Sequence, residues 1–97
     1  MNRLLLAVAL GLCSTFSAAA INVVATTSSM GMLTRTVGGE FVKVTELAFP
    51  DRDIHTLQVR PSMLQALRQA QLVVAIGAEL EQGWLPPAIE GSSNAKI

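Results

Sequence analysis

The sequence has few of the residue types that crosslink small domains or carry out their chemistry. It is 97 residues long and contains one cysteine, one histidine, one tryptophan and no tyrosine. A single cysteine excludes an intramolecular disulfide and a thiolate-rich zinc site. An excess of one charge is also lacking, because seven basic residues balance seven acidic ones. Without a basic excess, nucleic acid is not an expected partner.

The N-terminus has the three parts of a secretory signal peptide. Arg3 supplies the positive start, an apolar run covers residues 4–12, and Ala18–Ala20 provides the small residues of a cleavage site. The apolar run is shorter than the about 20 residues that a membrane-spanning helix needs. We therefore predict a signal peptide over residues 1–20, cleavage before Ile21 and a periplasmic mature protein.

Cys13 offers a second interpretation of the same segment, a lipoprotein signal that is acylated at this cysteine. Bacterial lipoprotein signals carry Gly, Ala or Ser immediately before that cysteine, whereas this chain has Leu12. Lipoprotein anchoring is therefore the less favoured interpretation. Cleavage after Ala20 would leave a mature chain without cysteine.

From Ile21 onward the chain alternates between strand-like and helix-like segments. Three runs rich in β-branched or apolar residues predict strands, at residues 21–26, 41–47 and 72–76. One helix is predicted after the hydroxyl caps of Thr27-Ser28-Ser29, and a second begins at Pro61. Alternating strands and helices are typical of βαβ units with a parallel sheet. We expect residues 21–97 to form an α/β lobe.

Further local features predict where these segments end. Gly38 and Gly39 are predicted to end the first helix, and Gly77 to open a turn. Residues 84–87 suggest a short helical segment, and residues 95–97 resemble a strand that is just beginning. We therefore expect the lobe to be the incomplete N-terminal part of a longer protein.

His55, the only histidine, is the strongest candidate functional residue. Neutral imidazole is the commonest metal ligand among side chains. The segment from Pro50 to Pro61 follows the second predicted strand, and sites in open α/β sheets gather outside the carboxyl ends of strands. These features make His55 a candidate metal ligand, which the rest of the chain supports. Asp51 or Asp53 either caps the local turn or orients the imidazole, and residue preference favours capping.

Taken in order, these segments resemble the N-terminal part of the periplasmic metal-binding components of ABC transporters for zinc and manganese. The resemblance covers nearly all of the chain after residue 20, and the order and spacing of the segments make it fairly specific. The segments are Val23-Val-Ala-Thr-Thr27, Val37-Gly-Gly39 with Val42-Lys-Val-Thr45, Asp53-Ile-His55 with Pro61-Ser62, Leu72-Val-Val-Ala-Ile-Gly-Ala-Glu-Leu-Glu81, and Trp84-Leu85.

The resemblance implies two α/β lobes joined by a long helix, with the transported Zn²⁺ or Mn²⁺ in the cleft between them. His55 matches the family's first metal-binding histidine. Ile54 stands where the family usually has proline, which relaxes the loop but keeps the ligand. The implied partners are an inner-membrane ABC permease and its cytoplasmic ATPase, and no organic cofactor is implied. Glu79 and Glu81 match a segment that does not bind metal, and we expect both at solvated surface positions.

Three alternatives are left open by the residues. The hydroxyls of Thr26 to Ser29 follow a strand, so they could present the nucleophile of a secreted enzyme or bind an oxyanion at a helix N-terminus. The chain lacks the G-x-S-x-G, G-x-G-x-x-G and P-loop motifs, and N-capping explains these hydroxyls. We therefore do not expect an enzyme. The third alternative is a truncated remnant that keeps the family's fold without its function.

Overall fold

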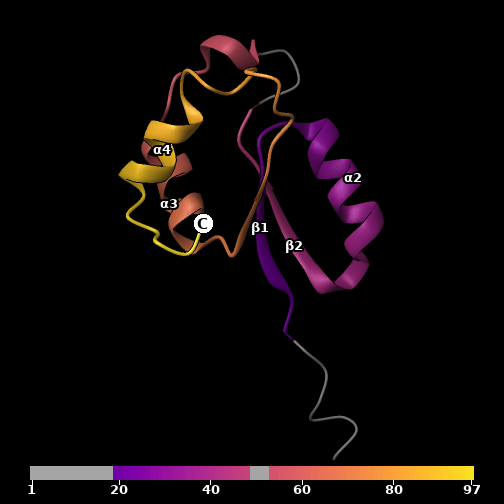
Figure 1. Cartoon of the computed structure of the whole chain (residues 1–97). Coiled ribbons are helices and arrows are strands. Elements are labelled where there is room, and N and C mark those ends of the chain that lie inside the picture. Colours follow the sequence, from indigo (N-terminus) through magenta and orange to yellow (C-terminus); the bar gives the residue numbers. More distant parts are fainter. Residues whose placement is uncertain (1–18, 49–52) are drawn as a thin grey trace, which may run out of the picture.

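The computed structural model describes residues 19–48 and 53–97. Its centre is a three-stranded parallel sheet with the strand order β2-β1-β3 (Figure 1). β1 (Ile21–Ala25) lies in the middle and pairs with β2 (Val42–Glu46) and β3 (Leu72–Val74). The predicted α/β class and parallel sheet are confirmed. The predicted signal peptide as far as residue 18, which includes Cys13, lies outside the described residues, as does Asp51.

Helices lie on both faces of the sheet (Figure 1). α2 (Ser28–Gly38) connects β1 to β2 on one face, and α3 (Pro61–Gln69) and α4 (Leu85–Gly91) lie together on the other. Two short 3-10 turns, η1 (Gly39–Phe41) and η2 (Ile54–Thr56), come before and after β2. None of the helices in the two described ranges reaches the length and apolarity that a membrane crossing requires.

Local features of the sequence explain where the helices begin and end. Thr27 caps α2, because its hydroxyl accepts a hydrogen bond from the Met30 N–H at 3.2 Å. Gly39 follows the last residue of α2 with a φ of +54°, a conformation that favours glycine. Pro61 is the first residue of α3, where a backbone N–H has no partner within the helix. All three features agree with the sequence predictions.

The hydrophobic core lies between the sheet and the α3–α4 pair. The apolar stripe that the sequence predicts for α3 consists of Met63, Leu64, Leu67 and Ala70; Met63, Leu67 and the C-cap residue Ala70 are at most 3% exposed, and Leu64 is partly buried. Burying side chains of this kind contributes about 1.5–3 kcal/mol each. The buried cluster consists of Val24, Leu47, Met63, Leu67, Ala70, Trp84, Leu85 and Ala88. This core positions the carboxyl ends of the strands against α3 and α4.

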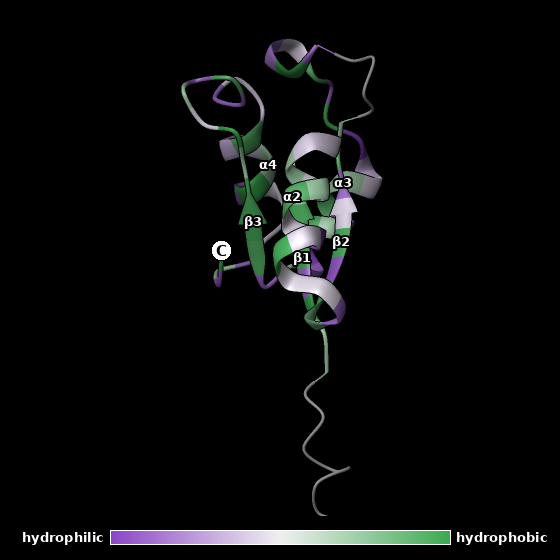
Figure 2. Ribbon diagram, turned by 90° about the vertical axis from the view of Figure 1, so that its right-hand side faces the viewer, coloured by the Kyte–Doolittle hydropathy of each residue, from purple (hydrophilic) through white to green (hydrophobic). Residues whose placement is uncertain are grey.

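The face of the sheet under α2 is only partly covered. Leu33 and Val37 of α2 are 51% and 89% exposed, and Leu72 of β3 is 48% exposed. With valines from all three strands they line an open groove of about 330 Å³. Figure 2 looks onto α2 and shows β3 beside it as an apolar strand. The continuous apolar run of residues 72–76 predicts a buried strand, and this prediction is wrong, because α2 packs mainly over β1 and β2.

All three strands are shorter than predicted, and β1 ends at Ala25 instead of at residue 26. Phe41 belongs to η1, so β2 begins at Val42. β3 ends at Val74, and the amides of Ile76 and Gly77 donate to a side chain instead of to a neighbouring strand. The course of the chain after β3 is thus set by a side-chain acceptor.

Residues 95–97, predicted as the start of a strand, form a turn instead. Asn94 determines this, because its Nδ2 donates to the carbonyls of Leu67 and Ala70 at 2.9 and 2.8 Å. Its Oδ1 accepts a hydrogen bond from the Lys96 N–H at 3.0 Å. A backbone N–H that a strand would pair with a neighbour is therefore bound locally.

Candidate metal site

His55 lies in the η2 turn, on the loop that joins β2 to α3. Figure 1 shows this turn beyond the carboxyl ends of the strands, at the edge where ligand sites of parallel α/β sheets form. The imidazole side chain is 61% exposed and therefore accessible from solvent. The predicted position of His55, on a loop after the second strand, is confirmed.

Asp53 both caps the η2 turn and faces the imidazole. Its Oδ1 accepts a hydrogen bond from the His55 N–H at 2.9 Å and lies 3.0 Å from His55 Nδ1. The hydrogen bond from the backbone N–H of His55, followed by the one from its ring, lowers the pKa of the Asp53 carboxyl. An ionised carboxylate can only accept, so it favours the tautomer with the hydrogen on Nδ1, and in the neutral ring of that tautomer Nε2 has the free lone pair. The two roles that the sequence left open, capping and orienting, are combined in Asp53.

Nε2 of His55 is therefore the atom that can bind a metal ion. Metal-binding histidines commonly donate their other ring N–H to a carboxylate, which fixes the tautomer and the ring orientation. Within residues 19–48 and 53–97, no group of three His, Cys, Asp or Glu side chains is placed to hold a metal ion. The described part of the site is thus one oriented imidazole with its carboxylate.

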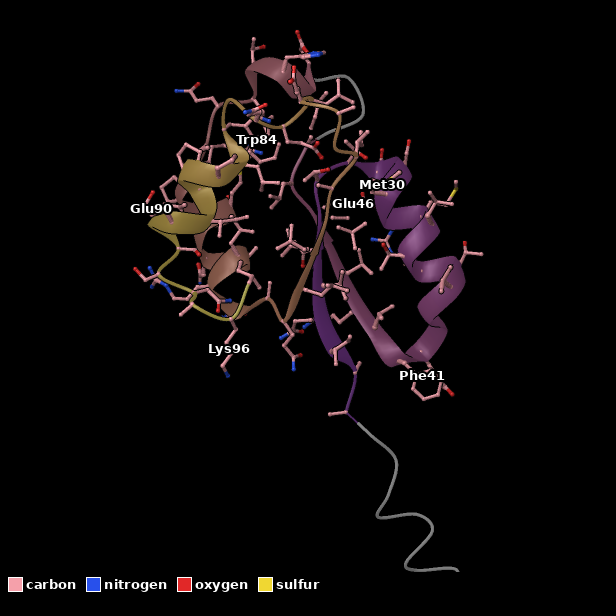
Figure 3. The ribbon with its side chains drawn as sticks, in the orientation of Figure 1. Met30, Phe41, Glu46, Trp84, Glu90 and Lys96 are labelled. Carbon is pink, nitrogen blue, oxygen red and sulfur yellow. The ribbon has the colours of Figure 1, made fainter. Side chains whose placement is uncertain are left out.

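The segment that leads into α4 holds the η2 turn in place. Trp84 is 4% exposed, and its Nε1–H donates to the carbonyl of Ile54, the residue before His55. Figure 3 shows Trp84 at the start of α4, below the η2 turn. Gly83 also lies against this turn, since a Cβ added to it would stand 3.4 Å from the His55 carbonyl oxygen. The backbone on both sides of the His55 amide is therefore in contact with a distant segment of the chain.

The predicted surface position of Glu81 is wrong. Glu81 is only 4% exposed, and its carboxylate accepts hydrogen bonds from the Thr26 hydroxyl and from the amides of Ile76 and Gly77, the last two at 2.7 and 2.9 Å. A carboxylate is tolerated in a buried position when such donors compensate its lost hydration. The only indication in the sequence is the four-residue spacing from Gly77, which lets the side chain reach back to the turn. Glu79 is exposed, as predicted.

The hydrogen bonds also determine the charge of Glu81. Burial raises the pKa of its carboxyl, but the hydrogen bonds from Thr26, Ile76 and Gly77 together outweigh burial and leave the pKa below its ordinary 4.5. Glu81 is therefore ionised at neutral pH and stabilises the fold in that form.

This stabilisation is expected to disappear in acid. Because the folded-state pKa of Glu81 is lowered, its contribution is fully present above pH 4.5 and declines as the pH falls through the folded-state value. Glu81→Gln should be less stable than the wild type at neutral pH, and the gap between their unfolding temperatures should narrow below pH 4.5. Thermal unfolding of both proteins across this range measures the effect. A gap that does not change with pH would contradict the assignment.

The hydroxyls that follow β1 contribute to the fold. Thr26 is fully buried and donates to Glu81, while the Thr27 hydroxyl caps α2. In the described part of the chain, neither hydroxyl is hydrogen-bonded to the imidazole that a serine- or threonine-type nucleophile would need as a base. The arrangement supports capping and internal bonding over a nucleophile or an oxyanion site.

The fold defines a class, the α/β lobes built on a parallel sheet, and places a histidine on the loop beyond the carboxyl edge of that sheet. The chain belongs to the family described as zinc-uptake complex component A periplasmic, ZnuA, whose family model matches residues 23–97. The resemblance found in the sequence is thereby confirmed.

Individual relatives agree with this assignment. The high-affinity zinc uptake system protein ZnuA of Yersinia pestis is 32% identical over 98 residues, covering 100% of this chain and 30% of that protein. A crystal structure of ZnuA matches with a TM-score of 0.70 and 29% identity, covering 77% of this chain and 28% of the other. An Mn-bound periplasmic metal binding protein from Candidatus Liberibacter asiaticus shares the fold, with a TM-score of 0.66 at 24% identity over 76% of this chain and 26% of the other. The chain spans less than a third of the length of these relatives.

Proposed function

We propose that this chain supplies a metal-binding lobe of the substrate-binding component of an ABC transporter, which captures zinc or manganese in the periplasm for uptake. The observation that carries the proposal is the Asp53–His55 pair at the carboxyl edge of a lobe of the ZnuA family. The relatives support it, because the Yersinia pestis protein belongs to a zinc uptake system and a ZnuA deletion mutant has been solved with zinc bound. The partners of this function are an inner-membrane permease and its cytoplasmic ATPase.

The pair suits reversible capture rather than catalysis. A neutral imidazole oriented by a carboxylate binds Zn²⁺ at about 2.0–2.1 Å through its free nitrogen. The proposal requires the other ligands to come from outside the described residues, so that His55 contributes one of about four. Ligands shared between two lobes would couple metal capture to closure of the cleft. The choice between zinc and manganese then depends on the other ligands, since an imidazole suits several divalent metals.

The proposal includes export. Residues 1–20 serve as the signal peptide and residues 21–97 as the metal-binding lobe. We expect N-terminal sequencing of the protein recovered from the periplasm to begin at Ile21, because Ala18–Ala20 forms a cleavage site and Leu12 is unsuited to precede a lipidated Cys13. A lipidated N-terminus at Cys13, or retention of Met1, would show that this part is wrong.

Equilibrium dialysis of the exported protein against zinc, manganese and phosphate tests the function. We expect zinc or manganese to be retained at one equivalent and phosphate not to be retained. Retention of phosphate alone would support the oxyanion-binding alternative that involves the hydroxyls after β1. Retention of none of the three would contradict the transport proposal.

A further inference from the structure

Glu81 connects two strands at the carboxyl edge of the sheet. Its carboxylate accepts from Thr26, the residue after β1, and from Ile76 and Gly77, which follow β3. Thr26 is fully buried and Glu81 is 4% exposed, so their contact is shielded from water, whereas Ile76, 40% exposed, lies at the outer side of the cluster. The metal capture described above uses none of these groups. A buried carboxylate with three donors therefore calls for a role of its own.

The turn before Glu81 adopts a backbone conformation that other contacts must hold. Gly77, Ala78 and Glu79 follow one another with φ values of +84°, +52° and +71°. Residues other than glycine rarely adopt positive φ, and they do so where the surrounding structure imposes it. The bonds from the Ile76 and Gly77 amides to the Glu81 carboxylate close this turn at both ends.

The main chain of Glu81 continues the connection to Trp84. The Glu81 carbonyl accepts hydrogen bonds from the amides of Trp84 and Leu85, at 3.2 and 2.9 Å. Trp84 then donates through its indole to the carbonyl of Ile54, beside His55. A continuous series of hydrogen bonds thus runs from the sheet edge through Glu81 and Trp84 to the η2 turn.

We propose that Glu81 is a positioning residue for His55. Its buried carboxylate connects the 77–81 turn to the ends of β1 and β3. Trp84 is thereby held against the Ile54 carbonyl, and the imidazole keeps its orientation toward the metal. The inference rests on the proposed role of His55 as a metal ligand. It differs from a purely structural role because it makes metal affinity depend on a residue that does not touch the metal.

His55 and Trp84 serve as reporters in the exported full-length protein, and their signals are assigned by their loss in His55→Gln and Trp84→Phe variants. Hydrogen exchange of the Trp84 indole N–H and the NMR signal of the His55 Nδ1–H can both be followed without metal. Zinc affinity is measured in parallel by competition with a chromophoric chelator. The variants are Glu81→Gln and Thr26→Val, with Thr26→Ser as the conservative variant that keeps the hydroxyl donor. Glu79→Gln is the matched control, because Glu79 is exposed.

We expect Glu81→Gln and Thr26→Val to weaken zinc affinity about 10-fold, as changes to groups around metal ligands typically do. Both should also speed exchange of the Trp84 indole N–H and broaden the His55 Nδ1–H signal. Thr26→Ser and Glu79→Gln should change none of the three. If Glu81→Gln fails to fold, Thr26→Val decides, because it retains the carboxylate and its two amide donors.

Two results would overturn the inference. The first is unchanged zinc affinity in a folded Thr26→Val or Glu81→Gln protein, whatever happens to indole exchange, since Glu81 would then hold only its own turn. The second is an unchanged indole and imidazole signal in the metal-free variants, since the series of hydrogen bonds would then not transmit the change. If the proposed function itself is wrong, His55→Ala leaves zinc affinity unchanged. In that case the metal-free signals of the Glu81 and Thr26 variants still report on positioning.

Discussion

Replacing His55 with alanine is expected to weaken zinc binding by at least about 10-fold. The change removes a metal ligand, and even the loss of a residue that only hydrogen-bonds to a ligand typically costs that much affinity. The fold should be preserved, since His55 lies on an exposed turn and outside the buried cluster. Calorimetric titration of the exported protein at neutral pH, with thermal unfolding measured alongside, checks both statements.

Two further variants make this result specific. Gln58→Ala changes an exposed residue of the same loop and should leave zinc affinity unchanged. Asp53→Asn keeps an oxygen that accepts from the imidazole but loses the charge, so its effect should be smaller than that of His55→Ala. Equal zinc affinities of the wild type and His55→Ala would make His55 an incidental loop histidine.

Replacing Trp84 with alanine is expected to have the largest effect on stability, a loss of about 3–5 kcal/mol. Trp84 is 4% exposed and belongs to the buried cluster between the sheet and α3–α4. Its removal leaves a cavity and also leaves the Ile54 carbonyl without its indole donor. Urea denaturation followed by circular dichroism measures the loss.

Trp84→Phe separates these two contributions. Phenylalanine fills most of the cavity but cannot donate to the Ile54 carbonyl, so we expect a loss of about 1–3 kcal/mol from the unsatisfied carbonyl. A loss below about 1 kcal/mol for both variants would contradict the placement of Trp84 in the core.

The features that the sequence predicted correctly depend on neighbouring residues. The Thr27 cap joins two residues three positions apart, and Gly39 and Pro61 act through their own backbone. The position of His55 followed from the order of strands and helices, because carboxyl ends of parallel strands share one edge. The Asp53–His55 contact spans two residues, so local turn chemistry was enough to anticipate the cap, while the orienting role was left as an alternative.

The features that the sequence did not predict depend on residues far apart in the chain. Glu81 is buried because Thr26, 55 residues earlier, donates a hydrogen bond to it. The sequence around Glu81 does not indicate that donor. The exposure of Leu72 depends on where α2 packs over the sheet, which a run of apolar residues cannot specify. The contact between Trp84 and Ile54 likewise joins residues 30 positions apart.

The most direct test of the account is the state of the His55 ring when metal is added to the exported protein. Its two ring nitrogens can be followed by ¹⁵N NMR after histidine-selective labelling, with the His55 resonances assigned by their absence from His55→Ala. The account predicts that zinc shifts the Nε2 resonance to that of a metal-bound nitrogen, while Nδ1 keeps its hydrogen and its bond to Asp53. Imidazole resonances that do not change at saturating zinc would contradict the assignment of His55 as a ligand.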